Sequence, residues 1–165
     1  MGVNIFFELT DRYGWVPPEI RPKEGIFKLG VVGLTSWYSN AFIGYTNMLR
    51  WVKVVAAADL GYDDDYIKKC IGLSKDEYRK YFRVKLYESP SEMIREEGLD
   101  GVFICTENSK HAEYAELAMK EGVHVFIAKP FATNLKDADR ILRAVEKSGV
   151  IVTTSSPARY DKMIR

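Results

Sequence analysis

Cysteine is scarce in this sequence, since only Cys70 and Cys105 occur among 165 residues. They lie in different sequence contexts, with neither a Cys-x-x-Cys motif nor a Cys/His spacing typical of a metal site. We therefore predict no metal centre. Without a disulfide framework, a reducing, cytoplasmic compartment is the expected location.

An excess of either charge is also missing, because 24 Lys and Arg residues face 23 Asp and Glu residues and leave a formal net charge of +1. This balance is not the basic footprint of a nucleic-acid-binding protein. Long apolar runs are absent too: no stretch reaches the roughly 20 residues of a transmembrane helix, and the N-terminus has no basic flank leading into an apolar stretch. We expect neither nucleic acid nor a membrane as a partner.

What is present is the composition of a globular domain. Hydrophobic residues make up 47% of the chain and charged residues 28%, which is enough apolar material for a core, and the length fits a single domain. Residues 1–25 are interrupted by Pro17, Pro18 and Pro22 and are interpreted as an N-terminal arm. From there, residues 26–156 keep a regular pattern of short apolar runs and amphipathic stretches.

This regular pattern predicts the α/β class, with a parallel sheet covered by helices on both faces in three αβα layers. Several of the short runs are apolar throughout, as strands buried on both faces are. The expected strands are 27–33, 52–58, 84–87, 101–106, 123–128 and 150–154.

Helices are expected between these strands. Segment 60–83 is charged and aromatic and should hold two short covering helices, and another helix should begin at Ser89 with a capping box. The first helix should bury a stripe of residues spaced three and four apart, namely Ala41, Phe42, Tyr45, Met48 and Leu49. The last helix should bury the face formed by Leu135, Ala138, Leu142 and Val145.

A glycine turn follows the first predicted strand at Gly33 and leads into a helix. The backbone N–H groups of such a turn, together with the helix N-terminus, can bind a pyrophosphate. A G-x-G-x-x-G motif anchored at Gly33 would need glycine where the chain has Thr35 and Tyr38. Hydroxyls of Thr35 and Ser36 can donate to phosphate instead. Trp37 and Tyr38 can equally fill the phosphate space, so an ordinary strand-to-helix turn stays open as the alternative.

Asp59 ends the second predicted strand, where a dinucleotide-binding fold carries the acid that binds the adenosine ribose. No arginine follows Asp59 directly. Its carboxylate would therefore repel a 2′-phosphate, which favours NAD over NADP as the cofactor. The alternative is that Asp59 only caps the helix that follows it.

Polar residues also follow the fourth and fifth predicted strands, at the edge where open parallel sheets bind ligands. Thr106 and Asn108 can hydrogen-bond a cofactor amide or ribose. Lys129 can hold a substrate hydroxyl and assist its proton transfer. His111 falls in the first turn of a helix, which favours local capping over catalysis, and His124, inside a strand, is interpreted as a packed structural residue.

Taken together, these segments resemble a known family. Residues 100–152 read DGVFICTENSKHAEYAELAMKEGVHVFIAKPFATNLKDADRILRAVEKSGVIV. The stretch is similar to the nucleotide-binding domain of the glucose-fructose oxidoreductase and inositol dehydrogenase (Gfo/Idh/MocA) family, whose pattern is a strand ending in Thr-Pro-Asn, a His three residues on, an Ala-rich helix, Gly-x-His-Val and a strand ending in Glu-Lys-Pro. The resemblance covers about residues 26–160 and includes the pair Arg159-Tyr160. It implies a Rossmann-type doubly wound sheet.

The resemblance also implies roles for individual residues. Lys129, with Pro130 fixing its turn, takes the place of the family's active-site lysine between nicotinamide and substrate, and is the expected catalytic residue. The implied reaction is hydride exchange between nicotinamide C4 and a carbinol carbon of a sugar or polyol. The expected cofactor-binding residues are Gly33, Thr35, Ser36, Asp59, Thr106, Asn108, His111, Lys129 and Pro130.

Some features depart from the family pattern. The glycine motif is degraded, Glu107 replaces the usual Pro, and Ala128 replaces the Glu of Glu-Lys-Pro. Loss of that Glu removes a carboxylate that would orient Lys129. Family members also carry a second α/β domain. Residues 157–165 are therefore interpreted as the start of a connection to a C-terminal domain that the chain lacks, and the isolated chain is expected to be inactive.

Two other hypotheses remain beside the oxidoreductase. The chain could be a non-catalytic dinucleotide sensor or partner-binding module with the same fold, because fold alone does not decide function. Alternatively, Trp37 and Tyr38 close the turn and no nucleotide binds. In either case, a surface left bare by a missing domain tends to self-associate, so a homo-oligomer is expected.

Overall fold

The computed structural model describes residues 25–46 and 48–154 of the chain. Apart from Gly25, the arm predicted for residues 1–25 lies outside the described residues, and so does the connection predicted for residues 157–165. The described residues hold the alternating strands and helices predicted from the apolar runs and amphipathic stretches.

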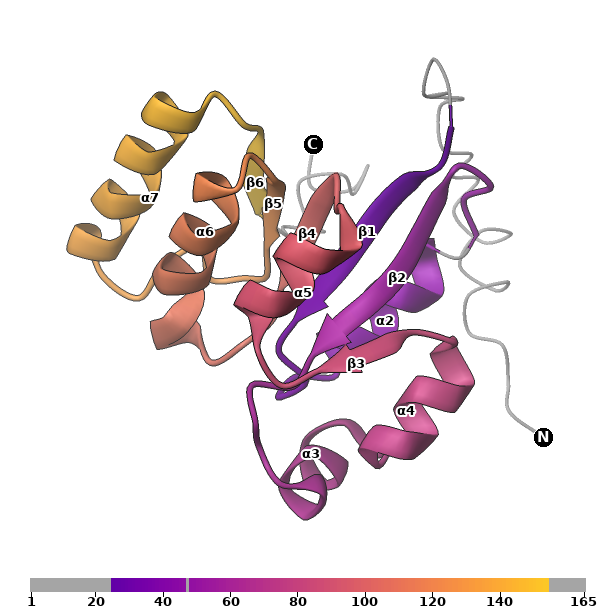
Figure 1. Ribbon diagram of the computed structural model, residues 1–165. Coiled ribbons are helices and arrows are strands. Elements are labelled where there is room, and N and C mark those ends of the chain that lie inside the picture. The colour runs from indigo at the N-terminus through magenta and orange to yellow at the C-terminus, as the bar shows by residue number, and fades with distance from the viewer. Residues whose placement is uncertain (1–24, 47, 155–165) are drawn as a thin grey trace, which may run out of the picture.

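One parallel sheet of six strands forms the centre of the structure (Figure 1). The spatial order is β3-β2-β1-β4-β5-β6, and every neighbouring pair is parallel. All six predicted strands are confirmed, with ends that differ by a few residues. The strands are β1 Phe27–Val32, β2 Val52–Ala58, β3 Lys85–Tyr87, β4 Gly101–Ile104, β5 His124–Ile127 and β6 Val152–Thr154.

Helices cover both faces of this sheet. On one face α5, α6 and α7 pack against the sheet, and on the other α2, α3 and α4 do so. This is the three-layer, doubly wound Rossmann arrangement, with the strand order 3-2-1-4-5-6. The helices are α2 Tyr38–Thr46, α3 Asp64–Ile71, α4 Lys75–Phe82, α5 Pro90–Glu97, the 3₁₀ turn η1 Asn108–Lys110, α6 His111–Lys120 and α7 Leu135–Ser148.

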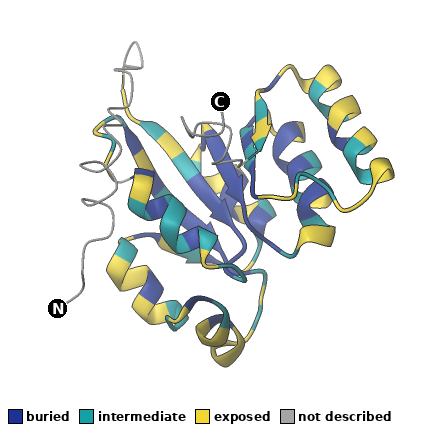
Figure 2. Ribbon diagram, turned by 180° about the vertical axis from the view of Figure 1, so that it is seen from behind, coloured by how far each residue is buried: buried dark blue, intermediate teal, exposed yellow. Residues whose placement is uncertain are grey.

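The two cores explain why the buried stretches of the strands are apolar on both faces. Val32 belongs to the core under α5, α6 and α7, whereas its neighbour Val31 belongs to the core under α2, α3 and α4. Ile104 and Phe103 divide in the same way on β4. Because successive side chains of a strand point to opposite faces, a stretch covered on both sides needs apolar residues at successive positions. Figure 2 shows the buried strands between helices whose outer faces are exposed.

The inner face of α2 differs from the predicted stripe. Tyr45 is half exposed and Met48 lies beyond the end of the helix, also half exposed. The buried residues of α2 are Ser39, Ile43 and Thr46. The Thr46 hydroxyl donates to the Phe42 carbonyl at 3.0 Å, so a polar residue can be buried without an unpaired group. The stripe prediction is confirmed for Phe42, which packs on the core, and is wrong for Tyr45 and Met48, because the buried face is centred on Ile43.

The inner face of α7 is also rotated from the predicted one. Ile141 is fully buried, whereas Leu142 is 53% exposed and Leu135 is 84% exposed. Ala144 and Val145 pack beside Ile141 against the core. The prediction was wrong for the two leucines, because α6 and the sheet meet α7 on the side that carries Ile141.

The helix ends mostly follow the predicted chemistry. Gly98 and Gly149 end α5 and α7 in the left-handed conformation. Ser89 accepts a hydrogen bond from the Glu92 N–H at 3.4 Å, while both halves of a capping box form instead at Ser74 and Glu77, where α4 begins. The two short helices expected in 60–83 are α3 and α4. In the part of the chain that the structure describes, no helix has the length and apolar character needed to cross a membrane.

The corrected face of α7 can be tested by a pair of adjacent substitutions. Ile141→Ala should lower the free energy of unfolding by about 2–5 kcal/mol, because it opens a cavity at a fully buried position. Leu142→Ala should change it by less than about 0.5 kcal/mol. Urea denaturation followed by circular dichroism measures both values. Equal losses in the two variants would contradict the face described above.

Candidate functional site

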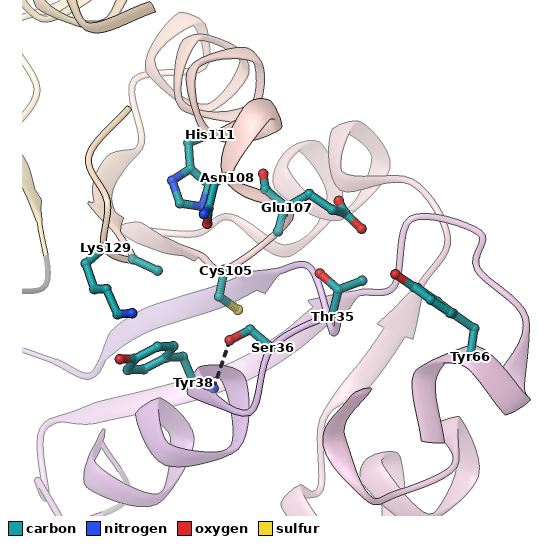
Figure 3. Close-up of a pocket in the computed structure, with 11 residues that line it drawn as sticks. Thr35, Ser36, Tyr38, Tyr66, Cys105, Glu107, Asn108, His111 and Lys129 are labelled. Carbon is teal, nitrogen blue, oxygen red and sulfur yellow. Dashed lines mark hydrogen bonds between the residues drawn. The ribbon is translucent and has the colours of Figure 1, made fainter. Parts of the chain in front are cut away.

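The carboxyl ends of the strands meet at one edge of the sheet, and a pocket of about 320 Å³ opens there (Figure 3). The chain leaves β1 toward α2 on one face and leaves β4 toward α6 on the other. Such a reversal between neighbouring strands creates the crevice in which open α/β sheets bind ligands. The pocket is lined by Thr35, Ser36, Tyr38, Tyr66, Cys105, Thr106, Glu107, Asn108, His111, Ala128 and Lys129.

Gly33 lets two backbones approach each other at the floor of this crevice. Its φ is +96°, and a Cβ placed on it would lie 2.8 Å from the backbone N and Cα of Thr106. Its own N–H donates to the Ala58 carbonyl at 2.9 Å, which ties the turn to the end of β2. No residue with a side chain fits this position without moving backbone, so the glycine predicted for the turn is required there.

The turn after Gly33 presents hydroxyls and leaves the pocket open. Thr35 and Ser36 both line the pocket, and the Ser36 Oγ accepts a hydrogen bond from the Tyr38 N–H at 3.4 Å (Figure 3). Trp37 is 60% exposed, stacks on Tyr38 and is not among the lining residues. The idea that both aromatic residues fill the phosphate space is therefore wrong for Trp37, while Tyr38 forms part of the wall.

Asp59 follows β2 directly and is almost fully buried. One carboxylate oxygen accepts the Gly61 N–H at 2.8 Å, and the other lies 2.9 Å from the Lys75 Nζ. The alternative that Asp59 caps the next helix is wrong, because Asp63 holds the N-cap of α3. Asp59 lies beside the glycine turn but outside the lining of the pocket.

The segment after β4 supplies four lining residues in a row, of which the last three are polar. Thr106 is buried against Gly33 and donates its hydroxyl to the Glu107 carbonyl at 3.2 Å. Asn108 is exposed at the start of η1. Both carboxylate oxygens of Glu107 are buried without a hydrogen-bond partner, and one lies 3.8 Å from the Lys110 Nζ. The predicted residues Thr106 and Asn108 both line the pocket. The Glu107 carboxylate lies between them in the chain, at the position where the resemblance pattern has proline.

His111 links α6 to the turn that carries Lys129. Its Nδ1 lies 2.9 Å from the Pro130 carbonyl, which accepts, so Nδ1 carries the proton and Nε2 is left as an acceptor. The side chain is buried, and Nε2 has no partner among the described residues. The prediction of local capping was wrong, because this hydrogen bond spans 19 residues.

Lys129 stands at the open side of the pocket, just after β5. It is exposed, and its Nζ lies 5.4 Å from the centre of the Tyr38 ring, toward which it extends in Figure 3. Within residues 25–46 and 48–154, no carboxylate forms an ion pair with Lys129. The loss of an orienting carboxylate through Ala128 stays a prediction, and the Tyr38 ring is an aromatic face that the ammonium approaches. The peptide bond between Lys129 and Pro130 is cis.

Two lining residues carried no signal in the sequence. Cys105 donates its thiol to the Gly33 carbonyl at 3.0 Å, and burial raises the pKa of that thiol, so it serves as a neutral donor. Tyr66 comes from α3, a covering helix that only the fold brings to the pocket.

The arrangement is suited to an organic ligand that carries phosphate and amide groups. Hydroxyl donors, a close-packed glycine turn and an unpartnered acceptor at the His111 Nε2 converge on one crevice. No group of three or more His, Cys, Asp or Glu residues that could hold a metal occurs in the described ranges. Fold and pocket together define the class of dinucleotide-binding α/β domains.

The chain belongs to the GFO/IDH/MocA family, an oxidoreductase family with an NAD-binding Rossmann fold, whose model matches residues 27–156. It is 29% identical over 116 residues to myo-inositol 2-dehydrogenase of Thermotoga maritima, covering 67% of this chain and 35% of that protein. It is 28% identical over 137 residues to inositol 2-dehydrogenase of Salmonella typhimurium, covering 82% of this chain and 38% of that protein.

Solved structures agree with the fold. A probable dehydrogenase from Thermotoga maritima superposes with a TM-score of 0.69 at 26% identity, covering 82% of this chain and 38% of that one. The WlbA dehydrogenase from Chromobacterium violaceum, solved with NADH and UDP-GlcNAcA, gives a TM-score of 0.74 at 17% identity, covering 91% of this chain and 40% of that one. The chain spans about two fifths or less of the length of these relatives.

The requirement for glycine at position 33 can be tested by comparing the stability losses caused by alanine at Gly33 and at Gly61. Gly33→Ala should lower the free energy of unfolding by about 2–4 kcal/mol, from a strained backbone and overpacking together. Gly61 also has a positive φ of +73°, but nothing lies within 4 Å of its added Cβ, so Gly61→Ala should cost only about 1–2 kcal/mol. Thermal unfolding of both variants makes the comparison. A larger loss in the Gly61 variant would contradict the close contact with Thr106.

Proposed function

We propose that this chain is the nicotinamide-dinucleotide-binding part of an oxidoreductase that exchanges a hydride with a carbinol carbon of a sugar or polyol. The observation that carries the proposal is the crevice in which the Gly33 turn, pressed against Thr106, shares one pocket with Lys129. Membership of the family supports the cofactor class, and the inositol dehydrogenases among the relatives support a polyol. Asp59, which follows β2 beside the turn, is the proposed ligand of the adenosine ribose.

The residues of the pocket fit such a cofactor. Gly33 has no side chain, so the backbone of the turn can lie directly against the backbone of Thr106. The N–H groups of the turn and the hydroxyls of Thr35 and Ser36 would donate to the pyrophosphate. The buried, unpartnered Nε2 of His111 would accept from an amide N–H, since its other ring nitrogen is held by the Pro130 carbonyl.

Lys129 is the proposed catalytic residue. When bound, the nicotinamide ring exchanges a hydride with the substrate carbon. The Lys129 side chain, at the open side of the pocket, would hydrogen-bond the substrate oxygen and take up or return its proton. Its position against the Tyr38 ring limits where the amine can reach. The His111 hydrogen bond to Pro130 restrains the turn from which Lys129 projects.

A titration with NADH, followed by nicotinamide fluorescence, tests the cofactor site. We expect saturable binding that Asp59→Ala weakens at least about tenfold, through loss of a charged hydrogen-bond acceptor for the ribose. Asp65→Ala is the matched control, because it removes the same charge from an exposed position on α3 and should leave the affinity unchanged. Absence of saturable binding by NADH and NADPH, in a chain shown to be folded by circular dichroism, would refute the proposal.

A non-catalytic dinucleotide sensor is the second candidate, and one observation favours it. Lys129 lacks an ion pair within the described ranges, and Ala128 stands where the family has an orienting carboxylate. A polyol-dependent reduction of NAD, assayed on the full-length gene product, separates the candidates. Turnover that Lys129→Met abolishes while NADH still binds supports the enzyme. Tight NADH binding without turnover on any polyol supports the sensor.

A further inference from the structure

The ion pair between Asp59 and Lys75 places a positive charge beside the proposed ribose site. The Lys75 Nζ lies 2.9 Å from one oxygen of Asp59, and the two side chains are 26% and 4% exposed. Lys75 is the first residue of α4, which follows α3 in the segment between β2 and β3. Nothing in the sequence pattern connects these residues, because they are 16 residues apart and only the packing of that segment brings them together.

Asp59 has no uncompensated charge in this arrangement. Its second oxygen accepts the Gly61 N–H at 2.8 Å, so both oxygens of the carboxylate are engaged. In a dinucleotide fold, the acid after this strand accepts from the ribose 2′-hydroxyl and, when its charge is not compensated, repels a 2′-phosphate. A carboxylate already paired with a lysine repels that phosphate much less.

The other charged groups around Lys75 are engaged elsewhere. Asp63 caps α3 by accepting the Tyr66 N–H, and Asp64 accepts the backbone N–H of Lys75 at 2.6 Å. Asp76 pairs with Arg79 and Lys80. The Glu77 carboxylate accepts the Ser74 N–H at 2.7 Å and lies 3.7 Å from the Lys68 Nζ. None of these four carboxylates forms an ion pair with the Lys75 ammonium in the described part of the chain, whereas Asp59 does.

We infer that Lys75 is a cofactor-specificity residue. Its ammonium compensates Asp59, leaves two further N–H donors for a ligand, and so lets the ribose site admit a 2′-phosphate as well as a 2′-hydroxyl. The chain then discriminates only weakly between NAD and NADP. This inference rests on the proposed function, and it concerns the adenosine end of the cofactor, away from Lys129.

The test compares the dissociation constants of NADH and NADPH in the same chain. In the native sequence, we expect the ratio of NADPH to NADH dissociation constants to stay below about tenfold. Lys75→Met should raise that ratio at least about tenfold, because two negative charges roughly 5 Å apart at an effective dielectric constant of about 20 repel by more than that factor. Fluorescence titrations at low ionic strength measure both constants, and circular dichroism checks that the variant is folded.

Two further variants control for the loss of a charge. Lys80→Met removes the same charge from the same helix, where the ammonium pairs with Asp76, and should leave the ratio unchanged. Lys75→Arg keeps the charge and should keep the native ratio within about threefold, since tenfold corresponds to only about 1.4 kcal/mol. Competition by adenosine 2′,5′-bisphosphate against 5′-AMP reads the same preference without the nicotinamide, and Lys75→Met should weaken the bisphosphate selectively.

The outcomes separate this inference from the proposed function. If both dinucleotides bind and Lys75→Met moves the ratio no more than Lys80→Met does, the inference is overturned while the proposed function stands. If the native chain already discriminates a hundredfold against NADPH, the inference also fails. If the folded chain binds neither dinucleotide, the proposed function and the inference fail together.

Discussion

Two backbones meet with no room for a side chain where the turn after β1 passes the end of β4. Gly33 sits there with a φ of +96°, and its absent Cβ would fall 2.8 Å from the N and Cα of Thr106. Thr35 and Ser36 come shortly after Gly33 in the chain, and Glu107 comes directly after Thr106. The pocket therefore depends on a single close approach, which places hydroxyl donors from one strand opposite polar groups from the next.

The sheet supports that contact by being buried on both faces. Val31 and Val32 are fully buried in opposite cores, so β1 has no freedom to shift toward either helical layer. The Cys105 thiol adds a hydrogen bond to the Gly33 carbonyl from the neighbouring strand. A rigid edge of this kind holds pocket residues in fixed relative positions, which a binding site for an extended, many-atom ligand requires.

Charge is arranged differently beside the glycine turn and beside Lys129. Beside the glycine turn, Asp59 is compensated by Lys75 and by the Gly61 N–H. Lys129 instead faces the Tyr38 ring, with no carboxylate to pair it among the described residues. A paired carboxylate keeps lone pairs that can accept further hydrogen bonds, and an exposed amine beside an aromatic ring keeps its N–H donors available.

The sequence by itself determined the α/β class, the six strands and the glycine turn, because burial on both faces demands continuous apolar runs and a positive φ demands glycine. It also singled out most of the pocket residues after β1, β4 and β5, since parallel strands end at one edge. It misassigned the inner faces of α2 and α7. A buried hydroxyl such as that of Thr46 donates to a nearby backbone carbonyl, so a polar residue can lie on the inner face of a helix. A pattern of apolar residues alone does not identify such a position.

Only the tertiary structure decided the contacts between residues far apart in the chain. The pairing of Lys75 with Asp59, the hydrogen bond from His111 to the Pro130 carbonyl and the arrival of Tyr66 at the pocket all depend on how loops and covering helices pack on the sheet. Local propensity and spacing carry no information about such packing, because these partners are chosen by shape and charge in three dimensions. For that reason the strands could be predicted from the sequence, while the electrostatics of the site could not.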